Sequence, residues 1–157
     1  MMTLRRGRAD DVKALAAIEA ACFSRPWSEY SIASHLSSES AMTLVCEEDG
    51  EALGVLFLSC LPPEGEVYRL AVLPAARRRG IGRRLLAAGL ALERDAGVRE
   101  MFLDVRASNA PAITLYEGFG FSSYGRRANY YFAPREDAIL MKRTLLEDEV
   151  FGDRELV

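Results

Sequence analysis

One turn in the middle of the chain constrains the fold most strongly. Residues 67–73 are rich in β-forming side chains, Pro74 follows them, and residues 81–96 carry apolar side chains at helical spacing. Between these two segments lies Arg-Arg-Arg-Gly-Ile-Gly, residues 77–82. Glycine lets the backbone turn and approach a ligand closely, and the unpaired N–H groups at a helix N-terminus attract anions. This order of features predicts a pyrophosphate site to which the arginines add further donors.

The same turn matches neither of the two common nucleotide-binding motifs. It lacks the Gly-Lys-Ser/Thr of a P-loop, and it lacks the third glycine of the dinucleotide-binding fingerprint. Two simpler interpretations compete with an anion site. A glycine-containing turn can serve helix packing alone, and an arginine run can be a solvated face. The remaining segments of the chain decide between these interpretations.

Length and composition narrow the classes of protein. The chain has 157 residues, of which 50% are hydrophobic, and this fits one domain with a single core. A net charge of −3 gives no overall attraction for nucleic acid, so the basic residues matter as a local cluster. One histidine and three distant cysteines match no zinc site, catalytic triad or disulfide framework. We therefore expect a cytoplasmic protein with reduced thiols, no metal, no direct nucleic-acid partner and no membrane contact.

The patterning predicts a mixed α+β fold within residues 1–146. Antiparallel hairpins are expected at both ends of the chain, one of them around Asp49-Gly50, and one parallel strand–helix–strand crossover in the middle. A ligand crevice should lie between Leu73 and Arg106, beyond the carboxyl ends of the parallel strands. Residues 147–157 are acidic and unpatterned, and we expect a loose C-terminal tail there. The expected strands are 3–6, 41–48, 52–61, 66–73, 100–106, 121–124 and 138–144, and the expected helices are 10–22, 28–37, 81–96 and one beginning near 109.

Several motifs in order resemble a known family. They are Leu70-Ala71-Val72-x-Pro74, Arg77-x-x-Gly80-x-Gly82, Asn109, and Leu115-Tyr116-x-x-x-Gly120-Phe121. Together they resemble the GNAT superfamily of acetyl-CoA-dependent N-acetyltransferases over residues 2–144. Residues 23–28, 103–109, 126–131 and 136–139 are similar to the branch that acetylates the N-terminal alanine of a small-subunit ribosomal protein. The resemblance implies a central, mostly antiparallel sheet, flanked by helices, in which the two parallel strands splay apart to admit a thioester.

The resemblance also implies how acetyl-CoA binds. Backbone groups of Leu70, Ala71 and Val72 would hold the pantetheine arm and the thioester carbonyl, and Asn109 would hydrogen-bond the same arm. The pyrophosphate would bind at the glycine-containing turn. The residues of that turn are Arg77, Arg78, Arg79, Gly80, Ile81, Gly82 and Arg83.

Three residues are candidates for proton transfer. The resemblance implies that Tyr116 protonates the leaving thiolate, which suits a phenol with a pKa near ~10, although its spacing alone would indicate a core aromatic. Asp104 occupies the position of the general base, where the family usually has glutamate. One missing methylene withdraws the carboxylate by roughly 1.5 Å, so we expect Asp104 to act through a water. Glu66, at the start of the neighbouring strand, is the alternative base, and an exposed structural charge is its competing interpretation.

The acceptor is expected to be a protein N-terminus. Neutralising an α-amine at pH 7 costs about 1 kcal/mol, against roughly 4.6 kcal/mol for lysine, and this favours an N-terminal amine for a water-mediated base. Trp27, Tyr130 and Tyr131 are aromatic anchors that would line the acceptor groove, with packing as the alternative role. We expect direct transfer from acetyl-CoA to the N-terminal alanine of a ribosomal protein. The alternatives are acetylation of a lysine or small-molecule amine, and a non-catalytic acyl-CoA-binding module.

Overall fold

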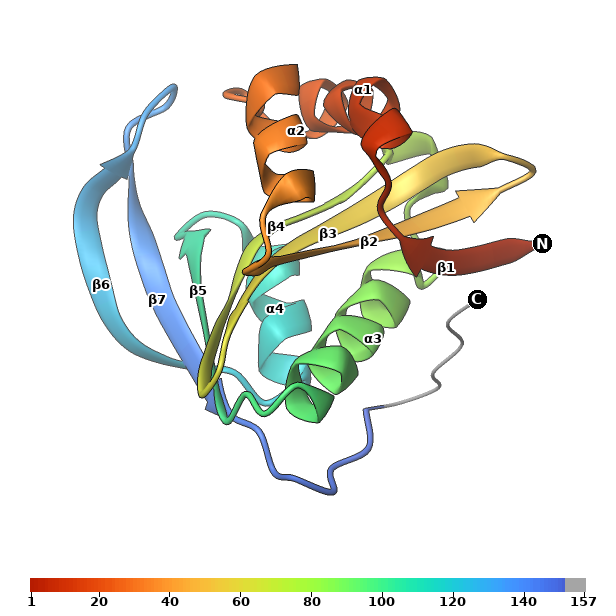
Figure 1. The fold of residues 1–157 in the computed structure, drawn as a ribbon. Helices are drawn as coiled ribbons and strands as arrows, with labels where there is room; N and C mark the ends of the chain where they lie inside the picture. Colours follow the sequence, from red (N-terminus) through yellow and green to blue (C-terminus); the bar gives the residue numbers. More distant parts are fainter. Residues whose placement is uncertain (152–157) are drawn as a thin grey trace.

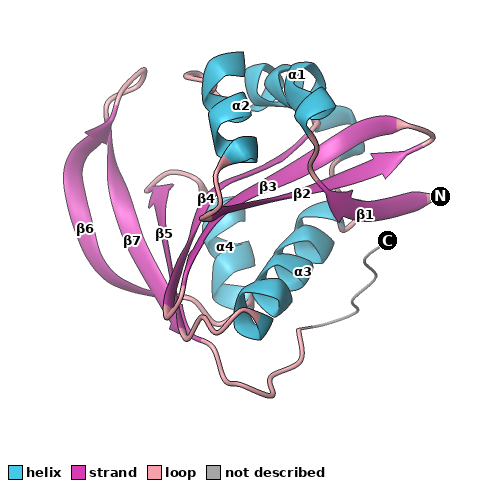
Figure 2. Cartoon of the chain, viewed as in Figure 1, coloured by secondary structure: helices cyan, strands magenta, loops and turns pink. Residues whose placement is uncertain are grey.

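A single mixed sheet of seven strands organises the structure, a computed structural model that describes residues 1–151. The strands lie in the order β1-β2-β3-β4-β5-β7-β6, and all neighbours are antiparallel except β4 and β5. Figure 1 shows α1 and α2 on one face of the sheet and α3 and α4 on the other, and Figure 2 separates these layers by colour. The strands are β1 (Met2–Arg6), β2 (Ala41–Glu48), β3 (Glu51–Leu61), β4 (Glu64–Val72), β5 (Glu100–Arg106), β6 (Ser122–Tyr131) and β7 (Glu136–Thr144), and the helices are α1 (Val12–Cys22), α2 (Glu29–Ser37), α3 (Ile81–Asp95) and α4 (Ala110–Gly118).

The parallel strands β4 and β5 diverge halfway along their length. Their ladder runs from the pair Glu64–Glu100 to the pair Val67–Leu103, after which β4 continues to Val72 and β5 to Arg106. A register shift against β3 leaves Tyr68 as the extra residue of a bulge, and bulges bend a strand locally. The expected splayed pair, and with it the predicted α+β fold class, is confirmed. The carboxyl ends of the two strands therefore enclose an opening.

Two hydrophobic clusters hold the helices against the sheet. Side chains alternate across a strand, so Leu56 and Leu58 of β3 pack toward α3, whereas Val55 and Phe57 pack toward α1 and α2. All four are completely buried, and each such side chain contributes about 1.5–3 kcal/mol. This double coverage makes β2–β4 the rigid part from which the opening is built.

Local signals in the sequence set several element ends as expected. The hydroxyl of Ser28 accepts a hydrogen bond from the N–H of Ser31 and caps α2. Asp49 and Gly50 both have positive φ in the β2–β3 turn, and Gly97 has a φ of 100° just after α3. The first helix differs from expectation, because a 3₁₀ turn occupies residues 9–11 and α1 begins at Val12.

The last two strands are longer than the sequence predicts. Strand β6 extends through residues 122–131, although residues 126–131 were expected to form a connection, and β7 begins at Glu136 rather than Ala138. None of the residues of β6 is fully buried. Because an uncovered edge strand needs no alternation of apolar and polar residues, its sequence carries little strand signal. The correction matters because Tyr130 and Tyr131, at the end of β6, border the opening.

The beginning of the expected loose tail packs against the domain. Phe151 is 4% exposed, and the guanidinium carbons of Arg94 and Arg143 lie 5.7 and 5.0 Å from its ring centroid. A buried aromatic ring and two cations over it explain why this part of the segment is held. The rest of the expected tail, residues 152–157, lies outside the described residues. None of the helices within residues 1–151 has the length and apolar character needed to cross a membrane.

Candidate active site

A cavity of about 440 Å³ occupies the opening between β4 and β5. Its walls are the diverging strands, α4, the segment between α1 and α2, and the turn between β6 and β7. We call it the central cavity. Among the residues that line it are six of the expected site residues, Leu70, Asp104, Asn109, Tyr116, Tyr130 and Tyr131. The structure thus brings together residues that are up to 61 positions apart in the sequence.

The glycine-containing turn has the backbone expected of an anion cradle. Arg78 and Gly80 have φ values of 65° and 79°, and Gly80 is the N-cap of α3. The backbone N–H of Arg84 donates to the carbonyl of Gly80 at 3.1 Å, so the backbone N–H groups of the residues before Arg84 point ahead of the helix. Two left-handed residues beside a helix N-terminus present a concave set of donors, which fits a pyrophosphate.

The arginines of this turn have different partners. Arg79 forms an ion pair with Glu48 at 2.7 Å, and Arg77 donates through Nε to the carbonyl of Val72 at 3.0 Å. The guanidinium carbon of Arg83 lies 5.4 Å from the ring centroid of Phe119. These three arginines therefore already contact the protein. Ile81 is buried beneath the turn, so the turn can offer an anion its backbone but not its side chain at this position.

The end of β4 offers backbone groups toward the opening. Residues 70–72 pair with β3 on one side, and the ladder to β5 stops at Val67 on the other. The carbonyl of Val72 accepts from the thiol of Cys22 at 3.3 Å as well as from Arg77. Ala71 is buried and packs toward α1, whereas Leu70 lines the central cavity. An extended ligand arm can hydrogen-bond this free strand edge in the manner of a neighbouring strand.

Tyr116 and Asn109 come from α4 and its cap. Tyr116 is 6% exposed, lines the central cavity and packs edge-on against Phe121. Burial, and secondarily Tyr131, raises the pKa of Tyr116 above its usual range, so its phenol remains a proton donor throughout the physiological range. Asn109 accepts from the N–H of Ala112 through Oδ1 at 3.2 Å. Its amide N–H groups are therefore the part of the side chain that a ligand can use.

The two candidate bases lie on the same face of the sheet. Glu66 pairs with Phe102, and Asp104 is two residues farther along β5, so both carboxylates project from one face. Both line a second hollow of about 760 Å³, and Asp104 also lines the central cavity. Burial, and secondarily the charge of Asp104, raises the pKa of Glu66. Asp104 is therefore the carboxylate that faces the same cavity as Tyr116.

The three aromatic residues expected to line the acceptor groove lie in two different hollows of the structure. The rings of Tyr130 and Tyr131 are 5.0 Å apart and line the central cavity. Burial, and secondarily Asp104, raises the pKa of Tyr131 to about 12. Trp27 instead packs at 4.8 Å from Phe57 and lines a hollow beside α2. The structure therefore brings the two tyrosines to the central cavity and gives Trp27 a packing contact outside it.

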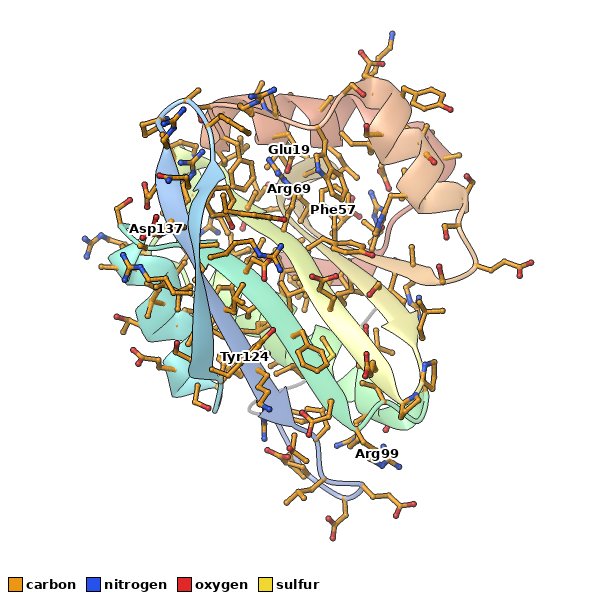
Figure 3. All side chains as sticks on the ribbon, turned by 90° about the vertical axis from the view of Figure 1, so that its left-hand side faces the viewer. Glu19, Phe57, Arg69, Arg99, Tyr124 and Asp137 are labelled. Carbon is orange, nitrogen blue, oxygen red and sulfur yellow. The ribbon has the colours of Figure 1, made fainter. Side chains whose placement is uncertain are left out.

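Arg69 is a residue that the sequence reasoning missed. From β4 it donates to both carboxylate oxygens of Glu19 at 2.9 and 3.0 Å and to the carbonyl of Arg25 at 3.2 Å. Glu19 is completely buried, and Figure 3 shows its side chain beside that of Arg69. The guanidinium also lies 4.1 Å from the ring centroid of Phe23. Arg69 thus holds the segment between α1 and α2 as one wall of the central cavity.

Arg106 does the same for the opposite wall. From the end of β5 it donates to the carbonyls of Phe132 and Pro134 at 2.8 and 2.9 Å, and it lies 4.6 Å from the ring centroid of Tyr131. Ser108 adds two hydrogen bonds to Glu136 in the same turn, at 2.6 and 2.9 Å. Arg69 belongs to none of the motifs recognised in the sequence, and Arg106 falls within residues 103–109 without a role being expected for it. The signal that could have found them is their position at the diverging ends of the two parallel strands.

Comparison with known proteins identifies close similarities over nearly the whole chain. The acetyltransferase (GNAT) family model matches residues 12–121. The [ribosomal protein bS18]-alanine N-acetyltransferase of Escherichia coli K12 is 35% identical over 143 residues, covering 90% of this chain and 96% of that protein. An N-alpha-acetyltransferase of Sulfurisphaera tokodaii is 34% identical over 155 residues, covering 90% and 92%. The crystal structure of the E. coli ribosomal-protein-S18-alanine N-acetyltransferase superposes with a TM-score of 0.86 at 33% identity, covering 96% of this chain and all of that one. The resemblance inferred from the motifs is confirmed.

Proposed function

Since the chain belongs to the acetyltransferase (GNAT) family and uses acetyl-CoA to acetylate an amine, we propose that its acceptor is a protein N-terminus, that of an alanine-initiated ribosomal protein. The observation that carries this proposal is the central cavity, in which a carboxylate and a buried phenol face one opening between two loops. The E. coli relative, named for acting on the alanine of a ribosomal protein, supports the choice of acceptor. Such an acceptor places the reaction in the cytoplasm.

The residues divide the binding of acetyl-CoA between backbone and side chains. The turn at residues 77–83 holds the pyrophosphate through the N–H groups at the start of α3, and Arg78 and Arg83 add guanidinium donors for phosphate oxygens. The contact of Arg83 with the ring of Phe119 is a cation–π contact and not an ion pair. The free edge of Leu70, Ala71 and Val72 and the amide of Asn109 hold the arm. When bound, acetyl-CoA supplies an electrophilic thioester carbonyl and a thiolate leaving group.

Asp104 and Tyr116 move the two protons. Asp104 accepts a proton from the incoming amine, through a water because its side chain is short, and the neutral amine then forms the new amide bond. Tyr116 donates its phenolic proton to the departing sulfur, and its high pKa keeps that proton in place until the thiolate develops. Glu66, which lines the second hollow together with Asp104, is the alternative base. The transfer is direct: Cys22 lines the central cavity, but its thiol donates to the carbonyl of Val72 at 3.3 Å and is used there as a structural contact.

Mass spectrometry of peptides tests the proposal. An alanine-initiated peptide, incubated with acetyl-CoA and the protein, should gain one acetyl group on its terminal nitrogen, and the same peptide with a blocked terminus and an internal lysine should gain none. Acetylation of the lysine peptide alone, or of polyamines alone, would replace the acceptor with a side chain or small molecule. Binding of acetyl-CoA without turnover on any amine would favour a binding module.

Two matched variants separate the candidate bases. Asp104→Asn should lower kcat by about 10²-fold or more at neutral pH, because general-base catalysis contributes about 10²–10⁴-fold. Glu66→Gln should change kcat by less than Asp104→Asn. The reverse order would assign the base to Glu66, and full activity of both variants would remove both carboxylates from proton transfer.

A further inference from the structure

The face of the sheet away from α3 and α4 is left open over its second half. Helices α1 and α2 contact β2, β3 and β4, and Figure 1 shows no helix over β5–β7 on that side. Between the covered strands and the curved β6–β7 hairpin lies the hollow of about 760 Å³ that Glu66 and Asp104 line. We call it the sheet-face groove. It runs beside β4 and β5 from Asp104 to Glu64.

Exposed apolar side chains gather in this groove. Leu61, Tyr68, Tyr124 and Tyr130 line it and are 61%, 43%, 50% and 40% exposed. They make up four of the nine large hydrophobic side chains that are exposed among the described residues. Figure 3 looks toward this side and shows Tyr124 in the open. Single exposed apolar residues are ordinary, but a gathering of them in a hollow marks a binding surface.

The charge of the groove favours a cationic occupant. Glu64, Glu66 and Asp104 line it, against one cationic residue, Arg127. The guanidinium carbon of Arg127 lies 5.0 Å from the ring centroid of Tyr130, so this cation is already placed on an aromatic ring. Carboxylates and tyrosine rings are both good partners for lysine and arginine side chains. An acidic or neutral chain would lack these contacts.

The groove continues directly from the transfer site. Tyr68, Asp104 and Tyr130 line both the groove and the central cavity. A polypeptide whose terminal amine is at Asp104 can therefore leave along the open face. Four strand positions separate the levels of Asp104 and Glu64, or roughly 13 Å, which an extended chain covers in about four residues. Its third to fifth residues would thus lie near Glu64.

We propose that the sheet-face groove binds the acceptor residues that follow the acetylated terminus and selects acceptors with lysine or arginine at about the third to fifth position. The proposal rests on the N-terminal acceptor argued above and adds which termini are chosen. Glu64 is the specificity residue at the far end of the groove. Tyr124 lines the same groove, with its ring packed against Phe102 and with Nζ of Lys142 5.3 Å from its ring centroid. Electrostatic complementarity of this kind acts mainly on selectivity and encounter rate.

Three alanine-initiated peptides test the proposal. They are identical except at positions three to five, which are all lysine, all glutamine or all glutamate. The expected kcat/KM is highest for lysine and lowest for glutamate, with about a tenfold difference between them that shrinks at high salt. Glu64→Gln should reduce the ratio of kcat/KM for the lysine peptide to kcat/KM for the glutamine peptide several-fold. Glu51→Gln, an exposed glutamate of the β2–β3 hairpin, is the matched control and should change nothing.

The outcomes separate this proposal from the proposed function. Equal kcat/KM for the three peptides overturns the groove as a selecting surface while N-terminal acetylation stands. An equal loss on all three peptides in Glu64→Gln also overturns it, because that would be a structural effect. If no alanine-initiated peptide is acetylated while acetyl-CoA binds, the proposed function is rejected, and the groove proposal is rejected with it.

Discussion

In β3, seven consecutive residues, 53–59, are buried, whereas in β6 no residue is. Strand β3 lies between α1 on one face and α3 on the other, and β6 is the edge strand of the uncovered half. A half that is covered on both faces supplies stability through apolar burial. A half that is open on one face keeps polar and aromatic side chains available to a partner. The opening between β4 and β5 lies where the two halves meet.

The largest expected effect is the loss of folding stability with rising pH that is caused by Glu93, which lies in the covered half. Its side chain is completely buried on α3, with only the weakly donating thiol of Cys60 close to its oxygens. Burial raises the pKa of Glu93 from 4.5 to about 8. The unfolded chain releases this proton near pH 4.5 and the folded chain near pH 8. The folded state therefore loses stability as pH rises between these values, by up to roughly 5 kcal/mol.

Denaturant titrations across pH measure this effect. Glu93→Gln should be more stable than the natural protein at pH 8 and close to it at pH 4, because the amide has no proton to lose. Glu66→Gln is the control from the edge of the open half, because Glu66 is on β4 and lines the sheet-face groove, and its less buried carboxyl predicts a smaller dependence of stability on pH. Parallel pH profiles for the natural protein and Glu93→Gln would contradict the assignment.

Truncating one side chain in each half compares the packing of the covered half directly with that of the open half. Leu56→Ala in β3 should lower the free energy of unfolding by about 3–4 kcal/mol. The side chain is completely buried, so its truncation leaves a cavity that the surrounding side chains cannot fill. Tyr124→Ala in β6, where the ring is half exposed, should cost less than about 1 kcal/mol. Urea denaturation of both variants gives the two values, and similar costs would show that the halves are equally packed.

The two arginines that hold the cavity walls extend the comparison to function. Arg69→Gln leaves the buried carboxylate of Glu19 without its cation and should cost about 3 kcal/mol of stability. Arg106→Gln removes bonds to exposed carbonyls and should cost less than about 1 kcal/mol. Both should raise KM for the acceptor peptide by about tenfold, with little change in KM for acetyl-CoA.

Steady-state kinetics in both substrates check this expectation. Arg126→Gln is the matched control, because its ion pair with Asp137 lies on the surface of the same hairpin, away from the cavity walls. An equal rise in KM for acetyl-CoA would mean that the arginines support the whole site rather than the acceptor walls.

Tyr116 lies at the junction of the halves and gives the last prediction. Tyr116→Phe keeps the buried ring and removes the proton, so kcat should fall by about 10²-fold, or 2.7 kcal/mol, with the unfolding free energy nearly unchanged. The measurement is kcat with a saturating alanine-initiated peptide. Unchanged kcat would assign protonation of the leaving group to another donor or to water.

Local sequence rules predicted the covered half well. The helix starts expected at residue 28 and near residue 109, and the turn expected at Asp49-Gly50, depend on the conformation of a few neighbouring residues. The structure has each of them where the sequence indicates, with Ser28 and Asn109 as the caps. The continuous apolar run of β3 is also an unambiguous strand signal between turn residues. The same rules failed for residues 126–131, because a strand without a buried face has no pattern to detect.

The candidate site divides in the same way. The glycine-containing turn before α3 was recognisable because its residues are contiguous and its function depends on backbone conformation. The packing partner of Trp27 and the hydrogen-bond partners of Arg69 and Arg106 could not be recognised in the sequence, because these partners are distant along the chain. A side chain's partner depends on where the fold brings other segments, and composition and spacing carry no information about that.

The sequence by itself determined the order of helices and strands in the covered half, the parallel crossover and the glycine-containing turn before α3, since each follows from local conformational preference and apolar periodicity. Only the tertiary structure decided that β4 and β5 pair for four residues and then diverge, because divergence results from the bulge at Tyr68 and from packing on both sides of the sheet. It also decided which side chains meet in the resulting cavity. Asp104, Tyr116 and Tyr131 line one cavity because the fold brings together the three separate elements β5, α4 and β6 that carry them.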